Sequence, residues 1–138
     1  MAGWREAAAV AAGGVIGTGL RLTLDTVIPH TDAEFPLSTL LVNIVGSFAL
    51  GALVSTLWRR ASTPNWLKLA LGTGMIGSFT TFSALIASLV TEAHHGRWML
   101  AALYLVLSLV LGFAAALAGL SVGRRPRPKP LEIDTVDE

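Results

Sequence analysis

The chain has 138 residues, of which 53% are hydrophobic and only 14% are charged, and its formal net charge is +1. The charged residues cluster at the ends of four long apolar runs, a pattern typical of an integral membrane protein and not of a soluble core. The near-neutral charge gives no indication of nucleic-acid binding, and the absence of cysteine excludes disulfides and thiolate chemistry.

The first apolar segment is predicted to run from Ala7 to Ile28. It is longer than the apolar core of a signal peptide and ends without a convincing cleavage site, so we expect a retained membrane helix. Gly13 and Gly17 are small residues four positions apart, as are Gly119 and Gly123 in the last segment. Both pairs favour close packing between helices.

Arg21 lies late in the first segment, four residues before Asp25. Its position alone favours a side chain that reaches the membrane interface beside Asp25 over one that attracts an anion at a pore mouth. The loop that follows, Pro29 to Pro36, contains His30 and two acidic residues and is predicted to be a short polar turn.

The second segment is predicted to run from Leu37 to Trp58. Small and polar residues recur at every fourth position of it and therefore share one helix face. They are Thr39, Asn43, Ser47, Gly51 and Ser55. Such a stripe either holds helices together or lines a water-filled path, and the Asn43 amide needs hydrogen-bond partners in either case.

The third segment, Trp66 to Val90, has glycines and hydroxyls at its centre, between Gly72 and Ser83. Glycine and threonine are weak helix formers, so we predict that this helix is broken near its middle. A break frees carbonyl groups that bind cations and N–H groups that attract anions. An ion site and a glycine-rich packing face remain equal alternatives on this segment alone.

Two adjacent histidines, His94 and His95, are predicted to lie in the next turn. We expect them to be solvated and not to bind a metal, because only Glu92 is near enough in sequence to act as a third ligand.

The fourth segment is predicted to run from Trp98 to Val122, with Tyr104 and Ser108 on one face. Prolines and mixed charges in the tail that follows predict disorder, with contact to anionic lipid headgroups at most. We therefore expect one four-helix transmembrane domain over residues 1–123 and a disordered tail over residues 124–138.

Four spans place both termini on the same side of the membrane. That side carries eight of the ten Lys and Arg residues, and the other side carries only Arg21 and Arg97. The positive-inside rule therefore predicts a multi-pass protein of the inner (plasma) membrane with both termini in the cytoplasm.

The residue types present in the four spans favour some classes of function over others. Catalysis finds little support, because the spans contain no Ser–His pairing, no zinc motif and no carboxylate pair. A proton-coupled multidrug exporter would need a carboxylate in the middle of the membrane, and the acidic residues lie near segment ends. Uncharged polar groups and loose backbone suit either the passage of a small ion or a packing scaffold.

Three motifs, in this order along four spans, together resemble the Fluc (CrcB-like) fluoride channel family. They are Gly13-Gly14-x-x-Gly17-x-x-x-Arg21, Thr39-Leu40-x-Val42-Asn43-x-x-Gly46-Ser47-Phe48-x-x-Gly51 and Gly77-Ser78-Phe79-Thr80-Thr81-Phe82-Ser83. The resemblance covers about residues 13–108 and implies a fluoride-selective channel that lets fluoride leave the cytoplasm passively.

The resemblance also implies an all-α membrane fold, an antiparallel dimer with two narrow pores, and a structural sodium ion at its centre. It implies that backbone carbonyls of Gly77 and Thr80 hold the sodium and that Arg21 lies in a vestibule, which reverses the assignment favoured by position alone. The pore-lining residues it implies are Thr39, Asn43, Phe82, Tyr104 and Ser108.

Two positions depart from the family pattern. Leu85 stands where the family has a second pore phenylalanine, and Gly112 stands where it often has a hydroxyl. Both put one pore in doubt, so a non-conducting or partly conducting partner subunit is the alternative to a full channel, and the small multidrug exporter is a weaker one. Together with the eight-to-two bias in basic residues, Leu85 leads us to expect a heterodimer in preference to a homodimer.

Overall fold

The computed structural model describes residues 2–28 and 36–124. Within these ranges it has four helical stretches that are long and apolar enough to cross a membrane: Gly3–Val27, Leu37–Thr56, Asn65–His94 and Trp98–Val122. About 20 apolar residues are needed to cross the hydrocarbon core as a helix, and each stretch meets that length. The predicted tail beyond Arg124 and residues 29–35 of the first loop lie outside the described residues.

The helices are α1 (Ala2–Val27), α2 (Leu37–Thr56), α5 (Phe82–His94) and α6 (Trp98–Val122), with three short elements between α2 and α5. These are α3 (Asn65–Leu69), the π-helix η1 (Ala70–Ile76) and α4 (Gly77–Phe79). The prediction for the fourth segment is confirmed in both bounds. The first helix begins five residues earlier than predicted and ends one residue earlier, at Val27.

Other boundary predictions were also wrong. The third span is Asn65–His94 and not Trp66–Val90. The second helix ends at Thr56 and not at Trp58, whose N–H bonds to the carbonyl of Leu53, five residues back. His94 is the last residue of α5 and not part of the turn, because the helical hydrogen bonds continue to His95, whose N–H bonds to the Thr91 carbonyl.

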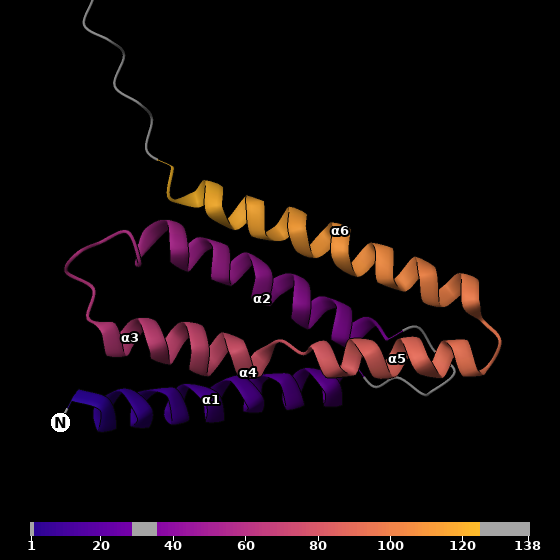
Figure 1. The fold of residues 1–138 in the computed structure, drawn as a ribbon, viewed down its shortest axis with the longest axis horizontal. Coiled ribbons are helices and arrows are strands. Elements are labelled where there is room, and N and C mark those ends of the chain that lie inside the picture. The colour runs from indigo at the N-terminus through magenta and orange to yellow at the C-terminus, as the bar shows by residue number, and fades with distance from the viewer. Residues whose placement is uncertain (1, 29–35, 125–138) are drawn as a thin grey trace, which may run out of the picture.

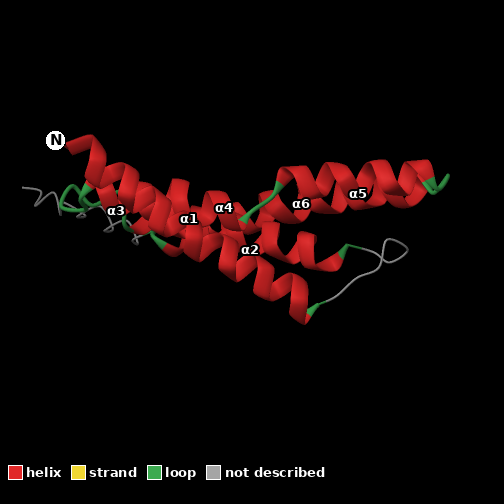
Figure 2. Ribbon diagram, turned by 90° about the horizontal axis from the view of Figure 1, so that it is seen from below, coloured by secondary structure: helices red, strands yellow, loops and turns green. Residues whose placement is uncertain are grey.

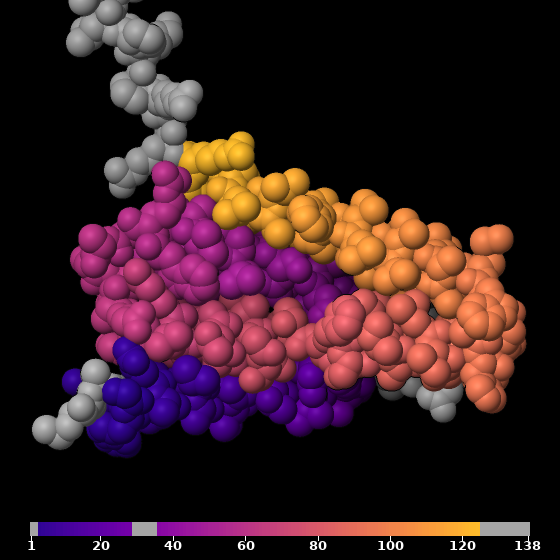
Figure 3. Space-filling model, viewed as in Figure 1, coloured from indigo at the N-terminus to yellow at the C-terminus, as the bar shows by residue number. Residues whose placement is uncertain are grey.

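The closest helix pairs are α2 with α6 and α1 with η1, and the described ends of the chain lie at the same end of the molecule (Figure 1). Figure 2 shows α5 alongside α6 at the opposite end from α3. Side chains of α2 and α6 fill the space between these two helices in Figure 3.

Glycines make these close approaches possible. A Cβ atom at Gly13 or Gly17 would collide with backbone of η1, and one at Gly119 would collide with the carbonyl of Phe48 in α2. A Cβ at Gly123 would collide with Ser55. Both pairs of small residues predicted from the sequence therefore lie at helix contacts, where only glycine lets two backbones come so close.

A buried ion pair fixes the turn between α5 and α6. Glu92 is 3% exposed, and its Oε2 lies 2.7 Å from Nε of Arg97, while Oε1 accepts a 3.0 Å hydrogen bond from Nη2. The backbone joins the pair, because the Arg97 N–H donates to the Glu92 carbonyl across Gly96, whose φ of 73° favours glycine.

We expect Glu92→Gln to lower the stability of the chain by roughly 1–3 kcal/mol, less than the roughly 3–5 kcal/mol of a fully buried pair, since Arg97 is about a third exposed. Thermal unfolding in detergent measures the loss. The matched control is Glu6→Gln, which removes a carboxylate that accepts one hydrogen bond from Asn65 on the surface. Equal melting temperatures for the two variants would contradict a stabilising role for the pair.

Candidate functional site

The site forms where α4 ends and α5 begins. Thr80 and Thr81 lie between the two helices with extended backbone angles, φ −75° and ψ 154° for Thr80 and φ −145° and ψ 118° for Thr81. Glycines and threonines concentrate here, and both are poor helix formers. We call these two residues the Thr80–Thr81 link. It lies in the thin loop between α4 and α5 in Figure 1.

The side-chain amide of Asn43, in α2, forms hydrogen bonds with both backbone groups of Thr81 in this link. Its Nδ2 donates to the carbonyl of Thr81 at 2.9 Å, and its Oδ1 accepts from the N–H of Thr81 at 2.8 Å. The side-chain amide thus pairs with the N–H and the C=O of Thr81, which lie outside the regular helices, and buried backbone groups require such partners. A small residue on α2 makes room, since a Cβ at Gly46 would collide with the methyl group of Thr80.

Thr81 also begins the next helix. Its Oγ1 accepts a 3.1 Å hydrogen bond from the N–H of Ala84 and lies 3.2 Å from Oγ of Ser83. Threonine is a favoured residue at this N-cap position because its oxygen replaces a missing helical acceptor.

These bonds divert two amide donors from the helical pattern. In a continuous α-helix the N–H of Thr81 would bond the Gly77 carbonyl, and that of Ala84 would bond the Thr80 carbonyl. Here the two donors bond Asn43 and the Thr81 side chain instead. The carbonyls of Gly77 and Thr80 are the two groups that the family resemblance singles out.

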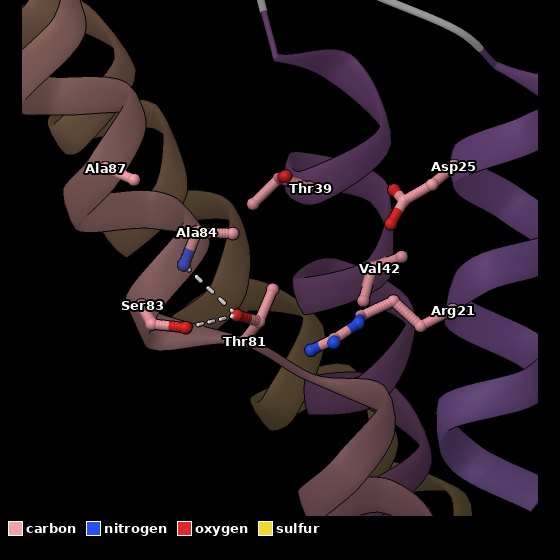
Figure 4. Close-up of a pocket in the computed structure, with 8 residues that line it drawn as sticks. All are labelled: Arg21, Asp25, Thr39, Val42, Thr81, Ser83, Ala84 and Ala87. Atoms are coloured by element: carbon pink, nitrogen blue, oxygen red, sulfur yellow. Dashed lines mark hydrogen bonds between the residues drawn. The ribbon is translucent and has the colours of Figure 1, made fainter.

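Two hollows flank the link. One, of about 240 Å³, is lined by residues that include Asn43, Thr80 and Phe82, and the Phe82 side chain is 72% exposed in the single chain. The other, of about 330 Å³, is lined by residues that include Arg21 and Asp25. Figure 4 shows Arg21 extending from α1 toward Thr81, with Val42 and Thr39 of α2 above it in the view. The link therefore separates a charged hollow from an uncharged one.

A group of hydroxyl side chains lies where α2, α5 and α6 meet. Tyr104 is fully buried, and its hydroxyl is surrounded by the side chains of Thr39, Ser88 and Ser108. Ser88 additionally donates to the Ala84 carbonyl at 2.9 Å. The group offers rotatable O–H donors from three helices and contains no charge.

The two departures from the family pattern have different surroundings. Leu85 is buried and packs with Leu40 and Tyr104, so it belongs to the core of this chain. A Cβ at Gly112 would meet only Oγ of Ser47, at 3.8 Å, so this position has room for a small side chain.

The structure brings the predicted residues together in three places. Asn43, Thr80 and Phe82 line one hollow, Arg21 and Thr39 line the other, and Tyr104 joins Ser108 in the hydroxyl group. Gly77 begins α4 and does not line either hollow among the described residues.

Sequence reasoning missed Thr81 and Ser88. A hydroxyl residue directly before a restarted helix is a sequence signal for an N-cap and identifies Thr81. Ser88 carries no such signal, because a lone serine in an apolar helix is common.

Four apolar helices around uncharged donors, with a charged hollow to one side, define a small multi-pass membrane protein of the channel or transporter class. A family described as CrcB-like protein, Camphor Resistance (CrcB), matches residues 8–120. The chain belongs to this family and is not an enzyme.

Relatives of known name support the assignment. The chain is 39% identical over 117 residues to the fluoride-specific ion channel FluC of Roseiflexus sp., covering 84% of this chain and 94% of that protein. It is 37% identical over 124 residues to FluC 1 of Mycobacterium bovis, covering 90% and 94%. It is 42% identical over 118 residues to FluC of Agrobacterium fabrum, covering 85% and 94%.

Proposed function

We propose that the chain is a subunit of a fluoride-selective channel that lets fluoride leave the cytoplasm passively. The observation that carries this proposal is the pair of hydrogen bonds between Asn43 and Thr81, called the Asn43–Thr81 junction, with uncharged hydrogen-bond donors beside it. Relatives of the chain are named fluoride-specific ion channels. A path without fixed charge suits conduction, because no single site then holds the ion too tightly.

The donors fit the chemistry of fluoride, a small anion that gives up water only for strong hydrogen bonds. The Asn43 amide carries two N–H groups, of which one bonds Thr81, and we assign the other to the ion. The exposed ring of Phe82 offers its electropositive edge beside the same hollow. Arg21 raises the local concentration of anions at the entrance.

We further propose a structural sodium ion, held by the carbonyl oxygens of Gly77 and Thr80 and not transported. Those oxygens fit a hard cation, and the amide donors that would occupy them in a continuous helix are bonded elsewhere. Bound sodium supplies a positive potential near the anion path. The two Asn43–Thr81 hydrogen bonds hold the extended backbone that directly follows Thr80.

Sodium is expected to raise the melting temperature of the purified protein. A ligand at a hundredfold above its dissociation constant adds about 2.7 kcal/mol of stability. The comparison is thermal unfolding in sodium chloride against N-methylglucamine chloride at equal ionic strength. Because backbone carbonyls do not titrate, the sodium effect should be the same at pH 6 and pH 8. Identical melting temperatures in the two salts would argue against the site.

For the assembly, we propose an antiparallel pair of subunits, with a different chain as the partner in preference to a second copy. The exposed Phe82 face is a surface for that partner. The bias in basic residues is eight on the inner side against two, Arg21 and Arg97, on the outer side. A chain with this bias is expected to insert in one orientation, with both termini in the cytoplasm.

We therefore expect nearly all copies of a C-terminal tag to be on the cytoplasmic face of intact cells. Protection of a single C-terminal cysteine from a membrane-impermeant reagent measures this orientation. A matched variant with Arg59, Arg60 and Lys68 changed to Gln should place a smaller fraction of tags on the cytoplasmic face, because the bias falls from eight-to-two to five-to-two. An even split for the unchanged chain would favour the homodimer.

Fluoride efflux from liposomes that contain this chain alone tests the channel proposal. Rapid efflux that chloride does not replace would support a channel and would also show that two copies of this chain form a working pair. The preferred heterodimer requires the partner chain in the same liposomes before efflux appears. The second candidate, a partner subunit with impaired pores, is favoured by Leu85, which is packed in the core at the position of the second pore phenylalanine. Like the preferred heterodimer, that candidate predicts no efflux from this chain alone and efflux with its partner present. It differs in predicting that Asn43→Asp in this chain leaves the efflux of the pair unchanged. Drug-driven proton exchange in the same vesicles would instead indicate an exporter.

A further inference from the structure

A third hollow, of about 880 Å³, lies beyond the ends of α2 and α6, at the same end of the molecule as the start of α1. Its volume is within the roughly 300–1,000 Å³ of sites that bind small molecules. Three of the described residues that line it are arginines and none is acidic. The lining residues are Ser55, Thr56, Arg59, Arg60, Val122, Gly123 and Arg124.

The two helix ends that carry these arginines are tied to each other. Oγ of Ser55 donates to the carbonyl of Gly119 at 3.1 Å and accepts from the N–H of Gly123 at 3.2 Å. Glycine at position 123 lets the end of α6 pack directly on Ser55. Arg124 is thereby held next to the end of α2, where Arg59 and Arg60 follow.

Three guanidinium groups around one hollow repel one another. The partial negative charge of two helix C-termini offsets part of this repulsion. A bound anion would remove more of it, and guanidinium groups bind phosphate oxygens through paired N–H donors. Since the hollow begins where two membrane-spanning helices end, the phosphates available at this depth are those of lipid headgroups.

We propose that this hollow is a binding site for the headgroup of an anionic phospholipid such as phosphatidylglycerol, with Arg59, Arg60 and Arg124 as its ligands. The site is distinct from the hollows beside the Thr80–Thr81 link, and it does not depend on the proposed conduction of fluoride.

Native mass spectrometry of the full-length protein with added phosphatidylglycerol or phosphatidylcholine tests the proposal. We expect phosphatidylglycerol to be retained preferentially. Each arginine near an anionic headgroup contributes roughly a fivefold gain in affinity, so Arg59→Gln, Arg60→Gln and Arg124→Gln together should weaken retention by about a hundredfold. Thermal unfolding of the triple variant checks that it is folded. The corresponding triple Arg→Lys variant keeps the charge without the paired donors and should keep only part of the preference.

The matched control removes the same charge from the tail, through Arg125→Gln, Arg127→Gln and Lys129→Gln, at positions outside the described residues. If this control loses as much lipid as the hollow variant, net charge and not the hollow attracts the lipid, and the proposal is wrong. Equal retention of the two lipids would also overturn it. Displacement of phosphatidylglycerol by millimolar inorganic phosphate would show a site for free anions instead of lipid.

Discussion

Asn43→Asp is expected to lower fluoride efflux by at least about a hundredfold. A carboxylate 4 Å from a passing anion costs about 4 kcal/mol at an effective dielectric constant of 20, which is more than enough for this loss. The substitution also replaces the N–H donor to the Thr81 carbonyl with a second acceptor, so one side of the junction is lost. Both effects act at the same point of the path.

The control for this prediction is Asn65→Asp, the same change at the other asparagine of the chain, whose amide donates to Glu6 at the surface. It should leave efflux within about twofold of the unchanged chain, because exposed charges are strongly screened. Size-exclusion chromatography in detergent shows whether the Asn43 variant still assembles. Undiminished efflux from an assembled Asn43→Asp protein would exclude Asn43 from the anion path.

Gly17→Ala is expected to destabilise the chain by about 3 kcal/mol or more, at the upper end of what overpacking costs. The new methyl group would collide with the carbonyl of Met75 and lie 3.1 Å from its Cα, and neither backbone atom can turn aside as a side chain can. Because α1 contacts the chain mainly through η1 and α4, the whole helix would have to move away from the Thr80–Thr81 link.

Gly19→Ala in the same helix is the matched control, since a Cβ there meets nothing within 4 Å. Alanine is the better helix former by about 1 kcal/mol, so this variant should be as stable as the unchanged chain or slightly more stable. Thermal unfolding in detergent compares the two. A similar loss for both would mean that the α1–η1 contact does not limit stability.

Local properties of the sequence were enough to predict the four membrane helices, although not all of their ends. The Trp98–Val122 helix was predicted in both bounds, because a membrane span must be a continuous apolar helix of a length that the bilayer sets. The role of the glycine pairs in helix contacts was also predicted from the sequence. A spacing of four residues places both members on one helix face, and close packing needs both to be small.

Contacts between distant residues required the tertiary structure. Asn43 and Thr81 are 38 positions apart, and no local pattern indicates that one side-chain amide bonds both backbone groups of a single residue. In the sequence, Leu85 occupies the position where the family has a second pore phenylalanine. Only the packing of three helices shows that it is a core residue beside Tyr104. Glu92, which reads as a charge at a helix end, is buried because the Gly96 turn returns Arg97 to it. Such pairings depend on how helices pack in three dimensions, whereas a span depends only on its own residues and the membrane.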